Sequence, residues 1–119
     1  MTRGPVPQKS IETALPVARA RGIVACCTPG PTGTCDFVIC EPVQTTLVRV
    51  RPGRRLHCPV PEIAEQFAEP VGRLRLVPDT ADRSRELWVV GQYGTIRFFR
   101  IGNTGLTEID RNGKTPGSA

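Results

Sequence analysis

The chain has 119 residues, of which 39% are hydrophobic and 23% charged, and its net charge is +5. These values fit one globular domain with its own core and exclude a disordered chain. No apolar run approaches the ~20 residues of a membrane span, and the N-terminus lacks the apolar stretch of a secretory signal. We therefore expect a cytoplasmic protein without a membrane partner.

The first half of the chain predicts one helix and three strands. Residues 1–9 hold prolines and a glycine without periodicity, which indicates a flexible arm. Ser10 is a candidate N-cap for a helix over 11–21 that ends at Gly22, and Pro16 predicts that this helix is kinked or shortened to two turns. Apolar runs rich in β-branched residues then predict strands at 23–27, 35–40 and 45–51.

The second half predicts a helix followed by a hairpin. The helix begins at Pro61 and carries an apolar face, with a kink near Ala68 caused by Pro70. That face is formed by Ile63, Phe67, Val71 and Leu74. Two further runs flank a loop that contains glycine and are typical of a β-hairpin, which offers a sheet edge for pairing with a second copy. The expected strands are 85–90, 95–101 and a short one at 106–109, and the polar residues 110–119 are expected to be a disordered tail.

These elements predict a single α/β domain over residues 10–109. Their order is α-β-β-β-α-β-β, and a mixed central sheet flanked by helices is the natural architecture for it. Trp88, Phe98 and Phe99 are expected in the core of this domain.

The five cysteines lie at positions 26, 27, 35, 40 and 58. Their odd number, in a chain without a signal sequence, argues against a disulfide framework. Their spacing contains no C-x2-C pair, which argues against a structural zinc site. We therefore expect them to be small apolar residues of the strands.

Charged residues on the second and third strands are expected to meet. Side chains alternate between the faces of a strand, so Arg49 and Arg51 share one face of the run 45–51. Asp36 lies on the preceding strand. If the two strands are neighbours, Asp36 beside Arg49 or Arg51 satisfies both charges, as buried charges require.

The order of elements over residues 10–101 resembles the PD-(D/E)XK nuclease superfamily, which has the restriction-endonuclease-like fold. Archaeal Holliday junction resolvases look closest in size and order. In that family an aspartate and a Glu-x-Lys triplet converge to bind a divalent metal and to position water. Asp36, in Thr34-Cys-Asp-Phe-Val-Ile39, matches the family aspartate, and Arg49-Val50-Arg51 lies where the triplet is expected.

The resemblance implies an Mg²⁺-dependent endonuclease in which Asp36 and Arg51 are catalytic and Asp36 holds the metal. Arg49, however, replaces the acidic ligand, and a guanidinium cannot bind a metal ion. Glu41 in the turn between the strands, or Glu12 in the first helix, is then the candidate second ligand.

A basic cluster follows the third strand. Arg49, Arg51, Arg54 and Arg55, with His57 nearby, are the candidate nucleic-acid contacts, because arginine forks match phosphate. The alternative is a solvated loop with internal ion pairs to Glu62, Glu65 or Asp36. We expect a catalytically degenerate domain that binds DNA or another nucleic acid. An active nuclease and an oligomeric protein, such as a homodimer without nucleic acid, are the alternatives.

Overall fold

The computed structural model describes residues 8–26, 35–53, 57–78 and 80–115. They form three helices and six strands, arranged in one sheet with the strand order β1-β2-β3-β4-β5-β6. The elements are α1 (Gln8–Arg21), β1 (Ile23–Cys26), β2 (Phe37–Cys40), β3 (Thr45–Pro52), α2 (Val60–Gln66), α3 (Ala68–Arg75), β4 (Arg83–Val90), β5 (Ile96–Ile101) and β6 (Leu106–Ile109). The predicted α/β class, a mixed sheet with helices packed on it, is confirmed.

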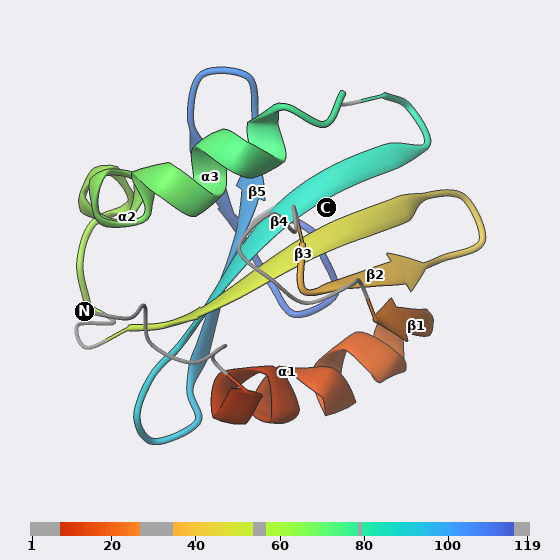
Figure 1. Ribbon diagram of the computed structural model, residues 1–119, viewed down its shortest axis with the longest axis horizontal. Coiled ribbons are helices and arrows are strands. Elements are labelled where there is room, and N and C mark those ends of the chain that lie inside the picture. Colours follow the sequence, from red (N-terminus) through yellow and green to blue (C-terminus); the bar gives the residue numbers. More distant parts are fainter. Residues whose placement is uncertain (1–7, 27–34, 54–56, 79, 116–119) are drawn as a thin grey trace, which may run out of the picture.

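The helices cover both faces of the sheet (Figure 1). The strands β3 and β4 are parallel, whereas the other neighbouring pairs of described strands are antiparallel and follow each other along the chain. A parallel pair needs a crossover connection, and α2 with α3 supplies it on the face opposite α1. The sheet therefore has an α1 face and an α2/α3 face.

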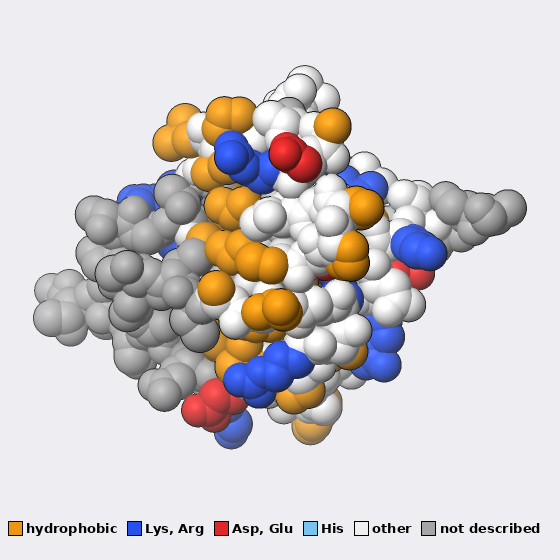
Figure 2. All heavy atoms as spheres, turned by 90° about the vertical axis from the view of Figure 1, so that its right-hand side faces the viewer, with side chains coloured by type: hydrophobic (Ala, Val, Ile, Leu, Met, Phe, Trp, Pro, Cys, Tyr) orange, Lys and Arg blue, Asp and Glu red, His pale blue; other side chains and the backbone are white. Residues whose placement is uncertain are grey.

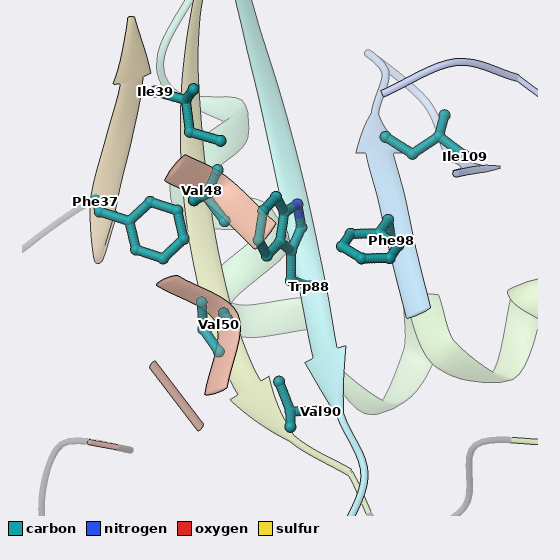
Figure 3. Close-up of a cluster of buried hydrophobic side chains, with 10 residues drawn as sticks. Phe37, Ile39, Val48, Val50, Trp88, Val90, Phe98 and Ile109 are labelled. Carbon is teal, nitrogen blue, oxygen red and sulfur yellow. The ribbon is translucent and has the colours of Figure 1, made fainter. Parts of the chain in front are cut away.

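Aromatic side chains form the core on the α1 face (Figure 3). Trp88 lies between Phe37 and Phe98, with ring centroids 5.5 Å and 4.8 Å apart in edge-to-face geometry. Val48 and Val50 of β3 join them, and Ala14 and Ala18 of α1 close the layer together with Ile39, Val90 and Ile109. The predicted core positions of Trp88 and Phe98 are confirmed.

The core on the α2/α3 face contains the predicted apolar stripe. Ile63, Phe67, Val71 and Leu74 are buried against Leu87, Val89, Phe99 and Ile101 of the sheet. The helix breaks between Gln66 and Ala68, where Phe67 leaves helical geometry with φ −111° and ψ 33°. This break confirms the predicted effect of Pro70, because the proline ring collides with the carbonyl four residues earlier.

The first helix differs from its prediction at both the start and the middle. It begins at Gln8, so Ser10 lies inside the helix and the predicted arm ends before residue 9. Gln8 and Lys9 are good helix formers and extend the first turn backwards. Pro16 lies within the helix on its exposed side, and the helix continues to Arg21 rather than stopping after two turns.

The C-terminal segment is ordered beyond the predicted boundary at residue 110. Asp110 Oδ1 accepts hydrogen bonds from the backbone N–H groups of Asn112 and Lys114, at 2.9 Å and 3.0 Å. Gly113 adopts φ +83°, which glycine tolerates without strain. The expectation of a disordered tail was therefore wrong for residues 110–115, because these residues have the chemistry of a tight turn.

The predicted hairpin does not provide a sheet edge. Its strands, β4 and β5, lie inside the sheet, since β4 pairs with β3 and β5 pairs with β6. Among the described strands, β1 and β6 are the outer ones. The expectation of an edge at 85–101 is therefore wrong, and the crossover between β3 and β4 is the physical reason.

None of the described helices is long and apolar enough to cross a membrane.

Candidate functional site

The site begins with Asp36, which immediately precedes β2 and is bonded to β3 twice. Its backbone N–H donates to the carbonyl of Val48 at 2.8 Å. Its carboxylate Oδ2 accepts the backbone N–H of Val50 at 2.6 Å. These two bonds fix the carboxylate beside the third strand, on the α2/α3 face of the sheet.

Two arginines of β3 face this carboxylate. Arg49 Nη1 lies 3.9 Å from Asp36 Oδ1, and Arg51 Nη1 lies 3.6 Å from Asp36 Oδ2. The side chains of Arg49, Asp36 and Arg51 are 7%, 9% and 24% exposed, respectively. The predicted pairing of Asp36 with the β3 arginines is confirmed, and Arg51 forms the more accessible side of the cluster.

Arg49 is poorly satisfied for a buried cation. Its ion-pair distance exceeds the 2.7–3.2 Å range of N–H···O hydrogen bonds. Among the described residues, its Nε is buried without a hydrogen-bond partner. Burying a guanidinium in this way costs free energy, because water offered bonds that the protein does not replace.

The surroundings of Arg51 are also positive. The pKa of Arg51 lies below the ordinary arginine value, first because of burial and then because of the like charge on Arg49, while Asp36 acts in the opposite direction. Arg51 Nη1 donates one hydrogen bond to the carbonyl of Val50 at 2.9 Å. From α3, Glu69 and Arg73 also act on Arg51, with opposite signs.

The candidate second metal ligands lie elsewhere. Glu41 follows the opposite end of β2, where its Oε1 accepts hydrogen bonds from Thr46 at 3.1 Å and from Arg21 at 3.3 Å. Glu12 is exposed on α1, beyond the other face of the sheet. Within the described segments, no group of three His, Cys, Asp or Glu side chains could hold a metal ion. The structure therefore does not bring Asp36 and Glu41 into one site.

The remaining candidate contacts are only partly described. Arg54 and Arg55 lie outside the described residues, and His57 is exposed. The expectation against disulfides was wrong at Cys35, which is disulfide-bonded. Antiparallel pairing places Cys26 of β1 opposite Phe37 of β2, so the end of β1 lies near Cys35. The number of cysteines does not contain this information about strand pairing.

The sequence did not reveal a second polar cluster on the α1 face. Glu86 is fully buried and accepts two hydrogen bonds from Arg21, at 2.8 Å and 2.9 Å, and one from Trp88 Nε1 at 2.8 Å. Burial lowers the pKa of Arg21, but the bonds to Glu86 and Glu41 raise it overall. The sequence offered one indication of this cluster, because Glu86 and Trp88 are two residues apart and therefore lie on the same face of a strand. Both terminal nitrogens of Arg21 are bonded to carboxylates, although its Nε has no partner among the described residues, and we assign this cluster a structural role.

A groove of about 790 Å³ lies between α1 and the β5–β6 part of the sheet. Its lining includes the apolar residues Val17, Ile96, Phe98 and Ile109 and the charged residue Arg111. Neither Asp36 nor the β3 arginines line it, because they lie on the other face of the sheet. The groove and the arginine cluster are therefore separate features.

The side of the molecule that carries β1 and the β2–β3 turn has a band of hydrophobic side chains (Figure 2). Ile23 of β1 is 76% exposed and Val43 of the turn is 83% exposed. Ile23 belongs to β1, which pairs only with β2 among the described strands.

Comparison with known proteins found no match among protein-family models, curated proteins or solved structures.

Proposed function

We propose that this chain is a nucleic-acid-binding domain with a restriction-endonuclease-like arrangement whose former catalytic strand contacts phosphate and does not cleave. The observation that carries the proposal is the cluster of Asp36, Arg49 and Arg51. One carboxylate there faces two guanidinium groups, and Arg49 is buried with unmet hydrogen-bonding capacity. Arginine forks match the geometry of phosphate oxygens, which makes phosphate the natural partner of this cluster.

The order of elements supports the nuclease-like interpretation. A helix, three antiparallel strands, a helical crossover and a strand parallel to the third follow each other from α1 to β4. In that interpretation Asp36 takes the place of the family aspartate, and Arg49 and Arg51 take the place of the Glu-x-Lys triplet. The overall charge of +5 adds a long-range attraction for nucleic acid.

The same geometry favours binding over cleavage. Mg²⁺ prefers a shell of oxygen ligands that includes carboxylates, whereas two cations within 4 Å of Asp36 repel a third. Asp36 Oδ2 is also occupied by the N–H group of Val50. An active Mg²⁺-dependent endonuclease, with Asp36 and Arg51 catalytic, is the alternative that the test below separates.

The test measures binding and cleavage on the same substrates. Labelled four-way junction, duplex and single-stranded DNA are titrated with the wild-type chain in EDTA, and are then incubated with Mg²⁺ or Mn²⁺. We expect salt-sensitive binding without metal and no strand scission with it. Cleavage that disappears in Asp36→Ala would overturn the non-catalytic part of the proposal, and lack of binding to every substrate would overturn the whole.

Self-association is a second candidate, favoured by the exposed apolar band beside β1. A strand edge with unpaired backbone groups and exposed Ile23 can pair with a second copy. Sedimentation of the wild type should then show a dimer that Ile23→Lys converts to a monomer. Thr107→Lys on the opposite outer strand, β6, is the matched control and should leave the dimer intact, since Thr107 is exposed there.

A cytoplasmic location remains part of the proposal, and Cys35 tests it. Cytoplasmic thiols are kept reduced, whereas Cys35 is bonded in this structure. Trapping the thiols with an alkylating reagent at the moment of cell lysis would show whether Cys35 is reduced or disulfide-bonded in the cell. Alkylated Cys35 supports the cytoplasm, and protected Cys35 contradicts it.

A further inference from the structure

The β3 arginines have more hydrogen-bond donors than the protein uses. A guanidinium carries five N–H donors. The side chain of Arg49 is 7% exposed, that is, 93% buried. Its Nη1 lies 3.9 Å from Asp36 Oδ1, which makes an ion pair without a hydrogen bond. Its Nε also lacks a partner among the described residues. The cluster therefore contains a buried cation with unused donors, as a site for an oxyanion would.

The charges of the cluster do not cancel. Arg49 and Arg51 contribute two positive charges and Asp36 one negative charge, which leaves one positive charge in surplus. The nearest charges of α3 do not change this sum, because Arg73 and Glu69 face each other at 3.9 Å. Arg51, at 24% exposure, connects this surplus to the solvent.

We propose that Arg49 and Arg51 form a site for a phosphomonoester, namely the phosphate at the end of a nucleic-acid strand. This inference rests on the proposed function and narrows it. A phosphate inside a strand is esterified on two sides and carries one charge, so it approaches a side chain that is only 7% exposed less readily than a terminal phosphate does. A terminal phosphate has three free oxygens and nearly two charges, and it can enter end-on.

The three residues then have separate roles. Arg49 binds the entering phosphate from below with its unused donors, and Arg51 binds it from the accessible side. Asp36 holds both guanidinium groups in place while its own Oδ2 stays anchored to Val50 N. The same chemistry would accept a free mononucleotide, so the experiment must distinguish a strand end from a small phosphate ester.

The test compares one short single-stranded oligonucleotide in three forms, with a 5′-phosphate, with a 3′-phosphate and with hydroxyl groups at both ends. We expect one phosphorylated form to bind about tenfold more tightly than the hydroxyl form. Arg49→Met should remove this preference. Arg19→Gln, which loses the same charge from an exposed position on α1, should keep it. Circular dichroism of each variant establishes that it is folded.

Two further arms keep the outcomes distinct. Equal binding of all three forms, or a preference that survives Arg49→Met, would overturn the inference while leaving nucleic-acid binding intact. If no oligonucleotide binds, the wild type is heated with inorganic phosphate and with adenosine monophosphate. If these small phosphates stabilise the wild type but not Arg49→Met, the phosphomonoester site is retained and the strand end is overturned as its ligand. If they do not stabilise the wild type, both the site and the strand end as its ligand are overturned.

Discussion

Asp36, immediately before β2, faces Arg49 of β3, and Asp36 Oδ1 lies 3.9 Å from Arg49 Nη1, within reach of an ion pair but beyond a hydrogen bond. Asp36 uses its other oxygen for the N–H group of Val50 at 2.6 Å. The aspartate is thus well bonded and the arginine is not. This asymmetry predicts that the two residues contribute unequally to stability.

Removal of Asp36 should destabilise the fold strongly. Asp36→Ala leaves two buried or half-buried guanidinium groups without their counter-charge and removes an acceptor from Val50 N, which costs about 3 kcal/mol. Arg49→Met should change the free energy of unfolding by less than about 1 kcal/mol or raise it, because the lost ion pair has no hydrogen bond. Urea unfolding followed by circular dichroism measures both. A larger loss from Arg49→Met than from Asp36→Ala would show that Arg49 is the structural member.

Glu86 should be the most sensitive charged position on the α1 face. Glu86→Ala removes both carboxylate oxygens that Glu86 offers to Arg21 and the acceptor of Trp88 Nε1, which leaves a buried cation with only the 3.3 Å contact to Glu41, and should cost about 3–5 kcal/mol. Glu41→Gln, which weakens a 3.3 Å contact of the same arginine, should cost about 1 kcal/mol or less. Trp88 is the single tryptophan, so its fluorescence reports unfolding directly. Similar costs for the two variants would contradict the assignment of Glu86 as the centre of the cluster.

The Arg97–Glu108 pair should make stability depend on pH in the acid range. The hydrogen bonds from Arg97 hold the pKa of Glu108 below its ordinary value of 4.5. Because the pKa of Glu108 is lower in the folded state, the pair stabilises the fold fully above pH 4.5. This stabilisation is lost as the pH falls through the lowered pKa of the folded state. Because Glu108 is 39% exposed, the effect should stay under about 1 kcal/mol.

The variant Glu108→Gln isolates this contribution from other carboxylates. The difference in unfolding free energy between wild type and variant should be constant near neutral pH and shrink as the pH falls below 4.5. A difference that grows on acidification would contradict the assigned direction.

The disulfide at Cys35 should stabilise the domain measurably. A disulfide bridge contributes about 2–4 kcal/mol by restricting the unfolded chain. Reductant and Cys35→Ser should therefore lower the unfolding midpoint to a similar extent. Cys40→Ser changes a free, exposed cysteine and serves as the control. An unchanged midpoint in reductant would show that the bridge is absent in solution.

Local chemistry explains which parts of the fold were predictable from the sequence. The stripe of Ile63, Phe67, Val71 and Leu74 encodes a helix face, and that face is buried as expected. Strand alternation also indicated that Asp36 could meet the β3 arginines. These predictions needed only the period of a helix or a strand and the requirement that buried charges be paired.

Long-range pairing explains which parts were not predictable. The interior position of β4 depends on the crossover that sets it parallel to β3, and periodicity does not contain that information. Arg21 bonds to Glu86, which lies 65 residues away in the sequence, and the pattern of the first helix carries no information about that contact. The distance between Asp36 and Glu41 likewise follows from the length of β2, which separates the two carboxylates that a metal site would need to bring together.

The most direct test of the central claim is the salt dependence of nucleic-acid binding by the wild type and Arg51→Met. Arg51 is the accessible member of the cluster, so its loss should weaken binding and reduce the slope of log affinity against log salt concentration by about one. The control Arg19→Gln, which removes an equal charge from α1, should change the affinity little and leave the slope as in the wild type. Equal slopes and affinities for the wild type and Arg51→Met would contradict the account, because the phosphate contacts would then lie elsewhere.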